Sequence, residues 1–434
     1  MGPMVLRPRC GSVVCGHETW HNRSSTADDR PRIPPGRWAP TCGREPAARQ
    51  NRNGRVMSEL DVDQIGAAIV KHQRGARFAE TTPDQWGDRL MQFIGAQAGV
   101  SDVRVANVRE VGTAAGGSNG TLLFEASWTE DGEPRSSGLV LRFMPTRGLF
   151  HAYDVTAQFN LQRALEATDV PVPPQIWLDP DGNLLGRPGY VMGMVEGASA
   201  PMTWMTSGII ADAEPAARRE MQLGYLEALA RVHALDWRAL GLEWLEKRAA
   251  GARPIEREVN WYWDSLEYAD CKPYLEALRP LRDWLVANEP ADIDTVLCHG
   301  DANFGNYLYL GTAVSAVVDW EMSFLGTPEC DVCFTHMGDQ IIQNDVPALE
   351  GTLSYQQRIA EYERLSGRKL RNMPYFELFT AYRLAVINVL TFRHFPEPIL
   401  RQLLPVIERG PKIAADLAAR VGLEILLPPS GTID

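Results

Sequence analysis

The chain has 434 residues, of which 45% are hydrophobic and 23% charged, and its formal net charge is -12 at pH 7. This length exceeds what one compact core supports, so we expect at least two lobes or domains. The acidic balance argues against a nucleic-acid partner, because phosphate backbones need a basic surface. The sequence contains no run of about 18 apolar residues, so it predicts no membrane span. The charge is compatible with a cationic substrate, although acidic surfaces usually serve only solubility.

Residues 1–56 differ in composition from the rest of the chain. They contain ten Arg, no Lys and four acidic residues, so they are basic by six and the remainder carries about -18. They are rich in Pro, and they show no helical or strand period and no apolar stretch of the secretory-signal type. We interpret them as a disordered extension, of the kind that a misassigned start produces, with Met57 as the natural beginning.

The alternative for this segment is a zinc site. Its candidate ligands are Cys10, Cys15, His17, His21 and Cys42. Their spacing fits none of the usual finger patterns, so the disordered extension is favoured.

Hydrophobic residues recur at helical spacing after Met57. One helix is predicted near residues 65–72, and a second begins at Thr82-Pro83-Asp84 with Pro in its first turn. One face of the second helix carries Trp86, Leu90, Phe93 and Ile94. We expect the two helices to form a small cap on the first lobe.

A glycine-rich segment separates two predicted strands, residues 103–111 and 121–128. The segment reads GTAAGGSNG and includes Gly117, Ser118 and Asn119. Glycine lets backbone N–H groups approach a phosphate closely. On its own the pattern favours an ordinary hairpin loop, and it lacks the Gly-Lys-Ser/Thr of a Walker loop.

The next predicted strand, residues 138–143, places Arg142 in an apolar run. A helix near residues 152–168 follows and carries Gln158. Residues 189–197 then predict a buried strand that opens into a glycine-containing linker. The plain alternative for Arg142 is an exposed residue of an edge strand.

The second half of the chain is predicted to be mostly helical. Amphipathic patterns cover residues 218–235, 355–366, 374–395 and 399–421. Arg383 and Asn388 interrupt the apolar run of the third pattern, which therefore predicts a buried helix and not a membrane helix. Cys330 and Cys333 form an isolated C-x-x-C pair, for which buried thiols in a reducing cytoplasm are favoured over a zinc or redox site. We expect a cytoplasmic protein.

Two stretches carry residues suited to chemistry. HGDANFGN places Asp301 five residues before Asn306, and VVDWE places Asp319 after the next strand. A substrate hydroxyl needs a carboxylate to accept its proton, and Mg²⁺ prefers oxygen ligands, which an amide and a second carboxylate supply. Protein kinases use this constellation for phosphoryl transfer.

With these motifs, HGDxxxxN and a strand that ends in D-W-E, the chain resembles the aminoglycoside phosphotransferases and their choline kinase-like relatives, most closely mycobacterial ones. The resemblance runs from about residue 82 to the C-terminus. It implies an α+β, bilobal protein-kinase-like fold, with a five-stranded antiparallel sheet in the N-lobe and a larger, mostly helical C-lobe. We expect the capped, nucleotide-binding N-lobe at residues 57–193 and the C-lobe, with catalytic loop and acceptor site, at residues 194–434.

The resemblance also implies roles for residues. Asp301 is the expected catalytic base, and Asn306 and Asp319 are the expected Mg²⁺ ligands. The implied ATP-binding residues are Gly117, Ser118, Asn119, Arg142, Gln158, Met192, Gly193 and Val195. Arg142 replaces the family's usual Lys and Gln158 its usual Glu, so we expect the Gln158 side-chain carbonyl to orient Arg142.

Three further residues are expected to act structurally. By the resemblance, Asp331 braces the catalytic loop through hydrogen bonds. His299 is expected to brace the same loop, because its neighbour Asp301 already supplies the base. His233, at the end of a helix, is expected to be a packed core residue.

The predicted reaction is transfer of the ATP γ-phosphoryl group to a hydroxyl of a small molecule. The acceptor stays open among aminoglycoside-like compounds, amino alcohols, sugars and hydroxyacyl groups. The alternative is a catalytically weak, nucleotide-binding pseudokinase with a regulatory role, which only the changed Arg142/Gln158 pair favours. The sequence does not reveal the oligomeric state.

A chain that begins at Met57 should match the full-length chain in melting temperature and in ATP affinity, because residues 1–56 bury too little surface to fold. Thermal melting and calorimetric titration of Mg-ATP into both chains test this. Metal-dependent protection of Cys10, Cys15 and Cys42 from thiol reagents would contradict it and support the zinc site.

Overall fold

The computed structural model describes residues 81–111, 119–146, 148–343, 346–392 and 407–428, together with residues 400 and 404. All of these belong to the unit Ser58–Asp434. The extension at residues 1–56, the helix expected near residues 65–72, and Gly117 and Ser118 lie outside the described residues. The expectations for them therefore stay predictions.

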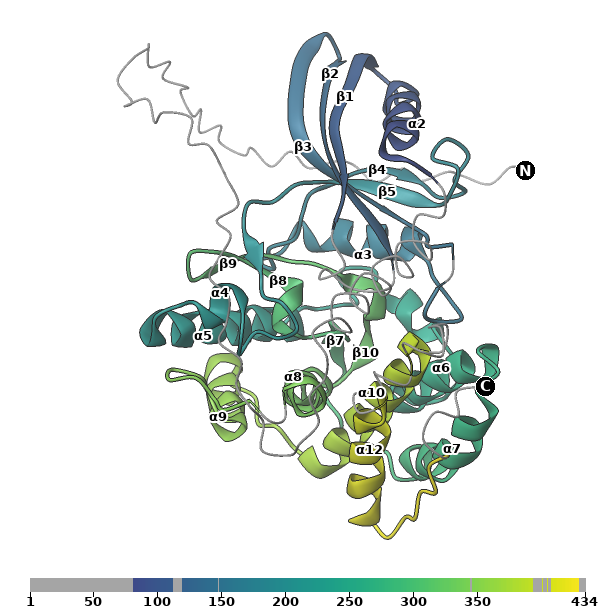
Figure 1. The fold of residues 1–434 in the computed structure, drawn as a ribbon, viewed down its shortest axis with the longest axis vertical. Coiled ribbons are helices and arrows are strands. Elements are labelled where there is room, and N and C mark those ends of the chain that lie inside the picture. Colours follow the sequence, from purple (N-terminus) through teal and green to yellow (C-terminus); the bar gives the residue numbers. More distant parts are fainter. Residues whose placement is uncertain are drawn as a thin grey trace, which may run out of the picture. The chain divides into compact units, whose positions relative to one another are not determined.

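The N-lobe contains one five-stranded sheet (Figure 1), with the order β1-β2-β3-β5-β4 and every neighbouring pair antiparallel. Its strands are β1 (Val100–Glu110), β2 (Gly120–Glu130), β3 (Glu133–Phe143), β4 (Gln175–Asp179) and β5 (Gly189–Gly193). The predicted five-stranded antiparallel sheet is confirmed. Side chains alternate between its two faces, so β2 and β3 each contribute to two different clusters.

Helix α2 (Pro83–Gly95) covers one face of this sheet (Figure 1). Thr82 and Gln85 form a capping box at its N-terminus, with Pro83 in the first turn. Its predicted apolar face is buried, with Trp86, Leu90, Phe93 and Ile94 packed against the sheet. Each such side chain contributes about 1.5–3 kcal/mol relative to exposure, so this face holds the helix in place.

Helix α3 (Val155–Leu165) lies on the other face of the sheet. The side chain of Asp154 caps it by accepting a hydrogen bond from the Ala157 N–H. Val155 packs with Val140 of β3 and Met192 of β5. Figure 1 shows α3 between the sheet and the helical lobe, so its side chains can reach residues of both lobes.

The C-lobe is mostly helical, as predicted. Its helices are α4 (Gly208–Ala211), α5 (Pro215–His233), α6 (Pro254–Tyr268), α7 (Lys272–Ala287), α8 (Pro328–Ile342), α9 (Tyr355–Ser366), α10 (Met373–Phe392) and α12 (Arg409–Ala419). Two small sheets complete it, one of β7 (Val296–Cys298) and β10 (Phe324–Gly326), the other of β6 (Ala198–Ser199), β8 (Tyr307–Leu310) and β9 (Ala313–Val317). Short 3₁₀ turns occur at η1 (Glu243–Lys247), η2 (Phe304–Asn306) and η3 (Trp320–Met322).

Helix α10 is a core helix of the C-lobe. Phe376, Phe379 and Tyr382 pack in the same cluster as residues of α6 and α8. None of the helices in the described part of the chain is long and apolar enough to cross a membrane. Cys330 and Cys333 are buried thiols of α8 and form no disulfide, as expected.

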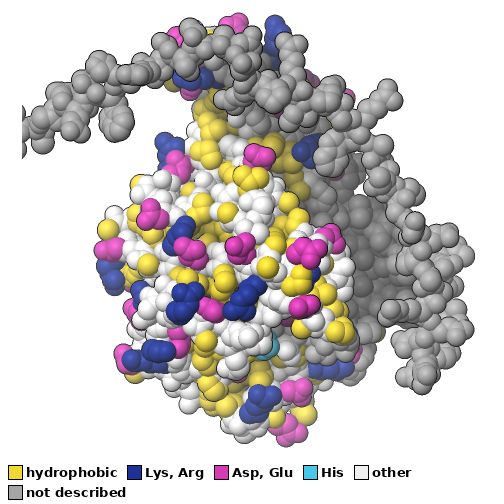
Figure 2. Space-filling view, turned by 90° about the vertical axis from the view of Figure 1, so that its left-hand side faces the viewer, with side chains coloured by type: hydrophobic (Ala, Val, Ile, Leu, Met, Phe, Trp, Pro, Cys, Tyr) yellow, Lys and Arg dark blue, Asp and Glu magenta, His cyan; other side chains and the backbone are white. Residues whose placement is uncertain are grey.

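The face shown in Figure 2 mixes acidic and basic side chains with small apolar areas. Neither sign of charge gathers into a continuous patch on it. This face therefore offers no extended basic surface of the kind that a phosphate backbone requires.

Candidate active site

Two chain segments meet at the candidate site because two short strands pair. The loop at residues 299–306 follows β7, the turn at residues 319–323 precedes β10, and Cys298 pairs with Phe324. Gly300 has φ +84°, and a Cβ on it would lie 1.9 Å from the Met322 carbonyl oxygen. Only glycine allows this close approach of the two backbones.

The Asp301 carboxylate is held by two amide side chains. Oδ1 accepts a hydrogen bond from Asn303 Nδ2 at 2.7 Å, and Oδ2 accepts one from Asn306 Nδ2 at 2.8 Å. Burial raises the pKa of Asp301 and the charge of Asp319 raises it further, although the two amides act against the rise. The side chain is thus oriented, and its ionised form is less favoured than that of a free Asp.

His299 connects the loop to the end of the segment before Asp319. Its Nδ1 faces the Asp301 N–H at 3.2 Å, and its Nε2 faces the Val318 carbonyl oxygen at 3.0 Å. An N–H can only donate and a carbonyl can only accept, so Nδ1 is the acceptor and Nε2 is the donor in these two hydrogen bonds. His299 therefore acts as a brace, as the sequence predicts.

Asp331 of α8 holds the backbone at the start of the loop at residues 299–306. It accepts hydrogen bonds from the His299 N–H at 2.7 Å and the Gly300 N–H at 3.0 Å, as expected. Burial acts to raise the pKa of Asp331, but its hydrogen bonds to His233 and to the Gly300 N–H outweigh burial and lower that pKa. His233 in turn bonds Tyr362 Oη at 2.7 Å and is fully buried, which is the packed role expected for it.

Asp319 has a left-handed backbone with φ +68°. Such a conformation is strained for a residue with a side chain and often occurs at functional sites. Its Oδ1 accepts a hydrogen bond from Arg142 Nη2 at 2.6 Å, and the same nitrogen lies 3.8 Å from Glu321 Oε2. Burial acts to lower the pKa of Arg142, but Asp319 and other neighbouring groups raise it above its ordinary value. Arg142 is therefore a permanent cation.

Asn119 closes the site from the side of the glycine-rich segment. Its Nδ2 donates to Glu321 Oε2 and to Gln158 Oε1, the latter at 3.3 Å. The side-chain carbonyl oxygen of Gln158 thus accepts its hydrogen bond from Asn119 and not from Arg142. The predicted Gln158–Arg142 contact is wrong. The acidic partners of Arg142 come from the C-lobe instead. Glu321 was missed as a site residue, although the D-W-E motif contains it.

Replacing Gln158 with Ala removes one acceptor from Asn119 and should weaken Mg-ATP binding only modestly. The expected loss is about 0.5–1.5 kcal/mol, the net value of one hydrogen bond. Calorimetric titration measures it, with Gln162→Ala, a buried amide of the same helix that bonds Tyr190, as the matched control. A loss as large as that from removing Arg142 would mean that Gln158 contacts the nucleotide itself.

Strand β5 leads into the linker between the lobes. The Gly193 N–H donates to the Pro174 carbonyl at 2.8 Å, and a Cβ on Gly193 would lie 2.7 Å from Pro174 Cγ. Met192 is buried against Val140 at the end of the strand. The resemblance implies that the Gly193 carbonyl and the Val195 N–H bind the adenine edge of ATP by hydrogen bonds, and this stays a prediction.

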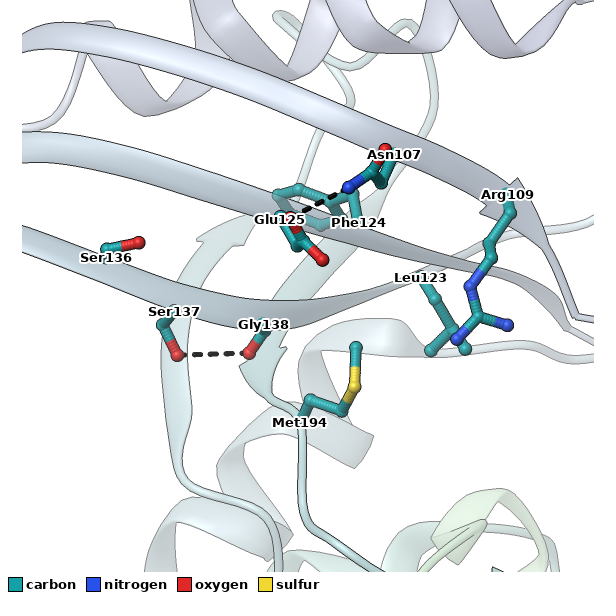
Figure 3. A pocket seen from close by; sticks show the side chains of 9 residues that line it. All are labelled: Asn107, Arg109, Leu123, Phe124, Glu125, Ser136, Ser137, Gly138 and Met194. Atoms are coloured by element: carbon teal, nitrogen blue, oxygen red, sulfur yellow. Dashed lines mark hydrogen bonds between the residues drawn. The ribbon is translucent and has the colours of Figure 1, made fainter. Parts of the chain in front are cut away.

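A pocket of about 380 Å³ lies between the sheet and this linker (Figure 3). Its walls are Asn107, Arg109, Leu123, Phe124, Glu125, Ser136, Ser137, Gly138 and Met194. Gly138 and Arg142 lie four residues apart on β3 and so share a face of the sheet. The separation along the strand is about 13 Å at 3.3 Å per residue. The pocket and the Arg142 cation therefore lie on the same face of the sheet, although Arg142 does not line the pocket.

The structure brings most of the predicted residues together. Asp301 and Asn306 are hydrogen bonded, as are Arg142 and Asp319, while Asn119 and Gln158 adjoin them. Among the described residues, Met192, Gly193 and Val195 lie farther along, beside the pocket. The arrangement offers a partly buried carboxylate, further oxygen ligands for a cation, and a fixed positive charge.

The chain matches the model of a family described as the phosphotransferase enzyme family, over residues 118–368. Among curated proteins, acyl-CoA dehydrogenase family member 11 of Gallus gallus is 28% identical over 268 residues, which are 57% of this chain and 33% of that protein. The chain thus spans about a third of the length of the curated relatives it matches first.

Two solved structures share the fold. A candidate aminoglycoside phosphotransferase from Ralstonia eutropha JMP134 aligns with a TM-score of 0.54 and 22% identity, over 76% of this chain and 98% of that one. The ethanolamine kinase of Plasmodium vivax aligns with a TM-score of 0.53 and 11% identity, over 84% and 95%. The expected bilobal kinase-like fold is confirmed; the mycobacterial affiliation stays a prediction.

Proposed function

Because the chain belongs to the phosphotransferase enzyme family, we propose that it is a small-molecule kinase that transfers the γ-phosphoryl group of ATP to a hydroxyl group. One observation carries this proposal. The Asp301–Asn306 pair and the Arg142–Asp319 ion pair lie where two loops meet, and the Val318 N–H joins these loops by donating to the Asn306 backbone carbonyl at 2.9 Å. This arrangement combines a proton acceptor, oxygen ligands and a fixed cation.

Asp301 orients the acceptor hydroxyl and takes its proton. As the hydroxyl oxygen bonds to the γ-phosphorus, the bond from that phosphorus to the bridging oxygen breaks and ADP leaves. The hydrogen bonds from Asn303 and Asn306 keep the carboxylate in one orientation, which reduces the entropy lost in reaching the reactive geometry.

The donor set suits Mg²⁺. Asp319 Oδ1 accepts a hydrogen bond from Arg142, so Oδ2 remains for a cation. Asn306 Nδ2 donates to Asp301, so the side-chain oxygen Oδ1 of Asn306 also remains. Hard oxygen ligands of this kind are those that Mg²⁺ prefers. When bound, Mg²⁺ neutralises charge on the β- and γ-phosphates.

We place the nucleotide along the shared face of the sheet. Its base would lie beside the pocket of Figure 3, with Met192 behind it and Gly193 and Val195 along its edge. Its phosphates would then reach Arg142 and the end of the glycine-rich segment at Asn119. The planar guanidinium can hold two phosphate oxygens at once.

For the acceptor we favour the hydroxyl of a hydroxyacyl thioester. The support comes from the curated relatives, which are named acyl-CoA dehydrogenases. This chain matches about a third of the length of each of the first two. A phosphorylating segment within such a protein would act on an acyl chain. The aminoglycoside and ethanolamine names belong to the solved structures alone.

A phosphate-transfer screen tests both the proposed kinase activity and the proposed hydroxyacyl acceptor. Purified protein with Mg-ATP is offered hydroxyacyl-CoAs, amino alcohols, sugars and aminoglycosides, and ADP formation is measured against Asp301→Asn as the control. Turnover with hydroxyacyl-CoAs above that with the other classes supports the acceptor. Turnover with another class alone overturns the acceptor but keeps the kinase. ATP binding without turnover on any acceptor would favour the regulatory pseudokinase.

A further inference from the structure

Two charged side chains are buried beneath the two active-site loops, and a third is partly buried beside them. Arg383 of α10 is fully buried, Glu258 of α6 is 2% exposed, and the side chain of Arg248, which follows η1, is 13% exposed. We call these residues the Arg–Glu–Arg triad. None of them belongs to the kinase motifs in the sequence. Burying a charged side chain costs free energy unless ion pairs and hydrogen bonds offset the lost hydration.

Arg383 makes its main contact with the catalytic loop. Its Nη2 donates to the Gly300 carbonyl, one residue before Asp301, and lies 3.3 Å from Tyr262 Oη. The guanidinium lies within about 5.5 Å of four ring centroids, those of Tyr262, Phe324, Phe334 and Phe379. Its Nε and Nη1 have no hydrogen-bond partner among the described residues. The buried cation therefore directs its strongest interaction at one carbonyl of the loop.

Arg248 makes the matching contact with the other loop. Its Nη1 donates to the Met322 carbonyl at 2.9 Å and to the Ser323 carbonyl. The guanidinium lies 3.9 Å from the Trp261 ring centroid, which limits its movement. Met322 and Ser323 follow Asp319 by three and four residues, so Arg248 holds the turn that carries the second acidic residue.

Glu258 forms an ion pair with Arg248 and lies in the field of Arg383. Its Oε2 lies 3.6 Å from Arg248 Nη1, and burial raises the pKa of Glu258 while Arg248 and Arg383 both act against that rise. The two loops that the arginines hold are themselves in contact, because Gly300 packs against the Met322 carbonyl. The triad thus spans the junction between the loops.

We propose that the Arg–Glu–Arg triad is a positioning device that sets the separation of Asp301 and Asp319. Arg383 holds the carbonyl beside Asp301, Arg248 holds the turn after Asp319, and Glu258 pairs with Arg248 and offsets part of the buried positive charge. The inference rests on the roles proposed above for Asp301 and Asp319. It assigns function to three residues that touch neither substrate nor nucleotide.

The variant Arg383→Met tests the device with little disturbance of packing. Met fills the aromatic cage around Arg383, and Glu258 keeps Arg248 as its counter-ion, so no unpaired buried charge remains. The matched control is Arg218→Met. Arg218 is also buried and donates to four backbone carbonyls, but these belong to Ile210, Ala211, Ala213 and Glu350, far along the chain from either loop.

We expect Arg383→Met to lower kcat by about 10- to 100-fold, because a small displacement of a catalytic group costs that much. The KM for ATP and the calorimetric Kd of Mg-ATP should change by less than about threefold, because nucleotide contacts are preserved. Arg218→Met should lower the melting temperature and leave kcat unchanged. Glu258→Gln combined with Arg383→Met should lower kcat by less than the product of the single effects.

Amide hydrogen exchange gives a readout that does not depend on turnover. Arg383→Met should increase exchange in residues 299–306 and also in residues 320–323, which Arg383 does not touch. Exchange that rises only around α10, or an unchanged kcat, overturns the proposal. If the wild-type protein transfers no phosphate at all, the proposed function fails and the exchange pattern alone decides the triad. If Arg383→Met does not fold, Arg383→Lys is measured in the same way.

Discussion

Replacing Asp301 with Asn should lower turnover by about two to four orders of magnitude, the usual contribution of general acid–base catalysis. Asn cannot accept the proton of the acceptor hydroxyl, but its size and one oxygen are kept, so one of the two hydrogen bonds from Asn303 and Asn306 survives. Mg-ATP binding should therefore stay nearly intact. Steady-state kinetics and calorimetric titration on the same preparation measure the two quantities separately.

Asp319→Asn is the matched comparison, because it should weaken Mg-ATP binding itself. Burial and Asp319 raise the pKa of Asp301, so wild-type turnover should fall as the pH drops through that raised pKa. The fall should be missing in Asp301→Asn, which has no carboxyl to protonate. Near-normal turnover in Asp301→Asn would show that another group is the base.

Replacing Arg142 with Ala should weaken Mg-ATP binding about 100-fold, or about 2.7 kcal/mol. The substitution removes a buried cation that can hold phosphate oxygens. It also leaves Asp319 and Glu321 as neighbouring carboxylates without their shared partner. Without the Arg142 cation the negative charge of Asp319 and Glu321 attracts a divalent cation more strongly, so binding of Mg²⁺ alone should not weaken. Titrations with Mg²⁺ and with Mg-ATP distinguish these two effects.

Glu321→Gln is the control for the Arg142 variant. It keeps the cation and removes one of its acidic partners together with the charge that Asn119 contacts. Its effect on Mg-ATP affinity should be smaller than that of Arg142→Ala, because Asp319 still pairs with Arg142. Unchanged affinity in Arg142→Ala would mean that the side chain does not face the nucleotide, and the pseudokinase alternative would then gain support.

The sequence by itself determined the local elements and indicated the candidate catalytic residues. Helix α2 was predictable because its cap, its Pro and its four apolar residues all lie within one short stretch. Strand β2 shows the alternation of a half-buried strand, and β5 is buried along its whole length, as its apolar run predicts. Asp301, Asn306 and Asp319 were predictable because their spacing is local, within five residues for the first two and a single hairpin for the third.

Only the tertiary structure decided which side chains meet across the two lobes. Gln158 lies where a helix carboxylate was expected, yet the carboxylates that pair with Arg142 are Asp319 and Glu321, the first of them 177 residues away in the chain. Arg383 contacts Gly300 across 83 residues, and in the sequence it is merely an interruption of an apolar run. Such contacts depend on how helices and loops pack, and no local periodicity records them. A buried charge therefore shows its partner only when the chain is folded.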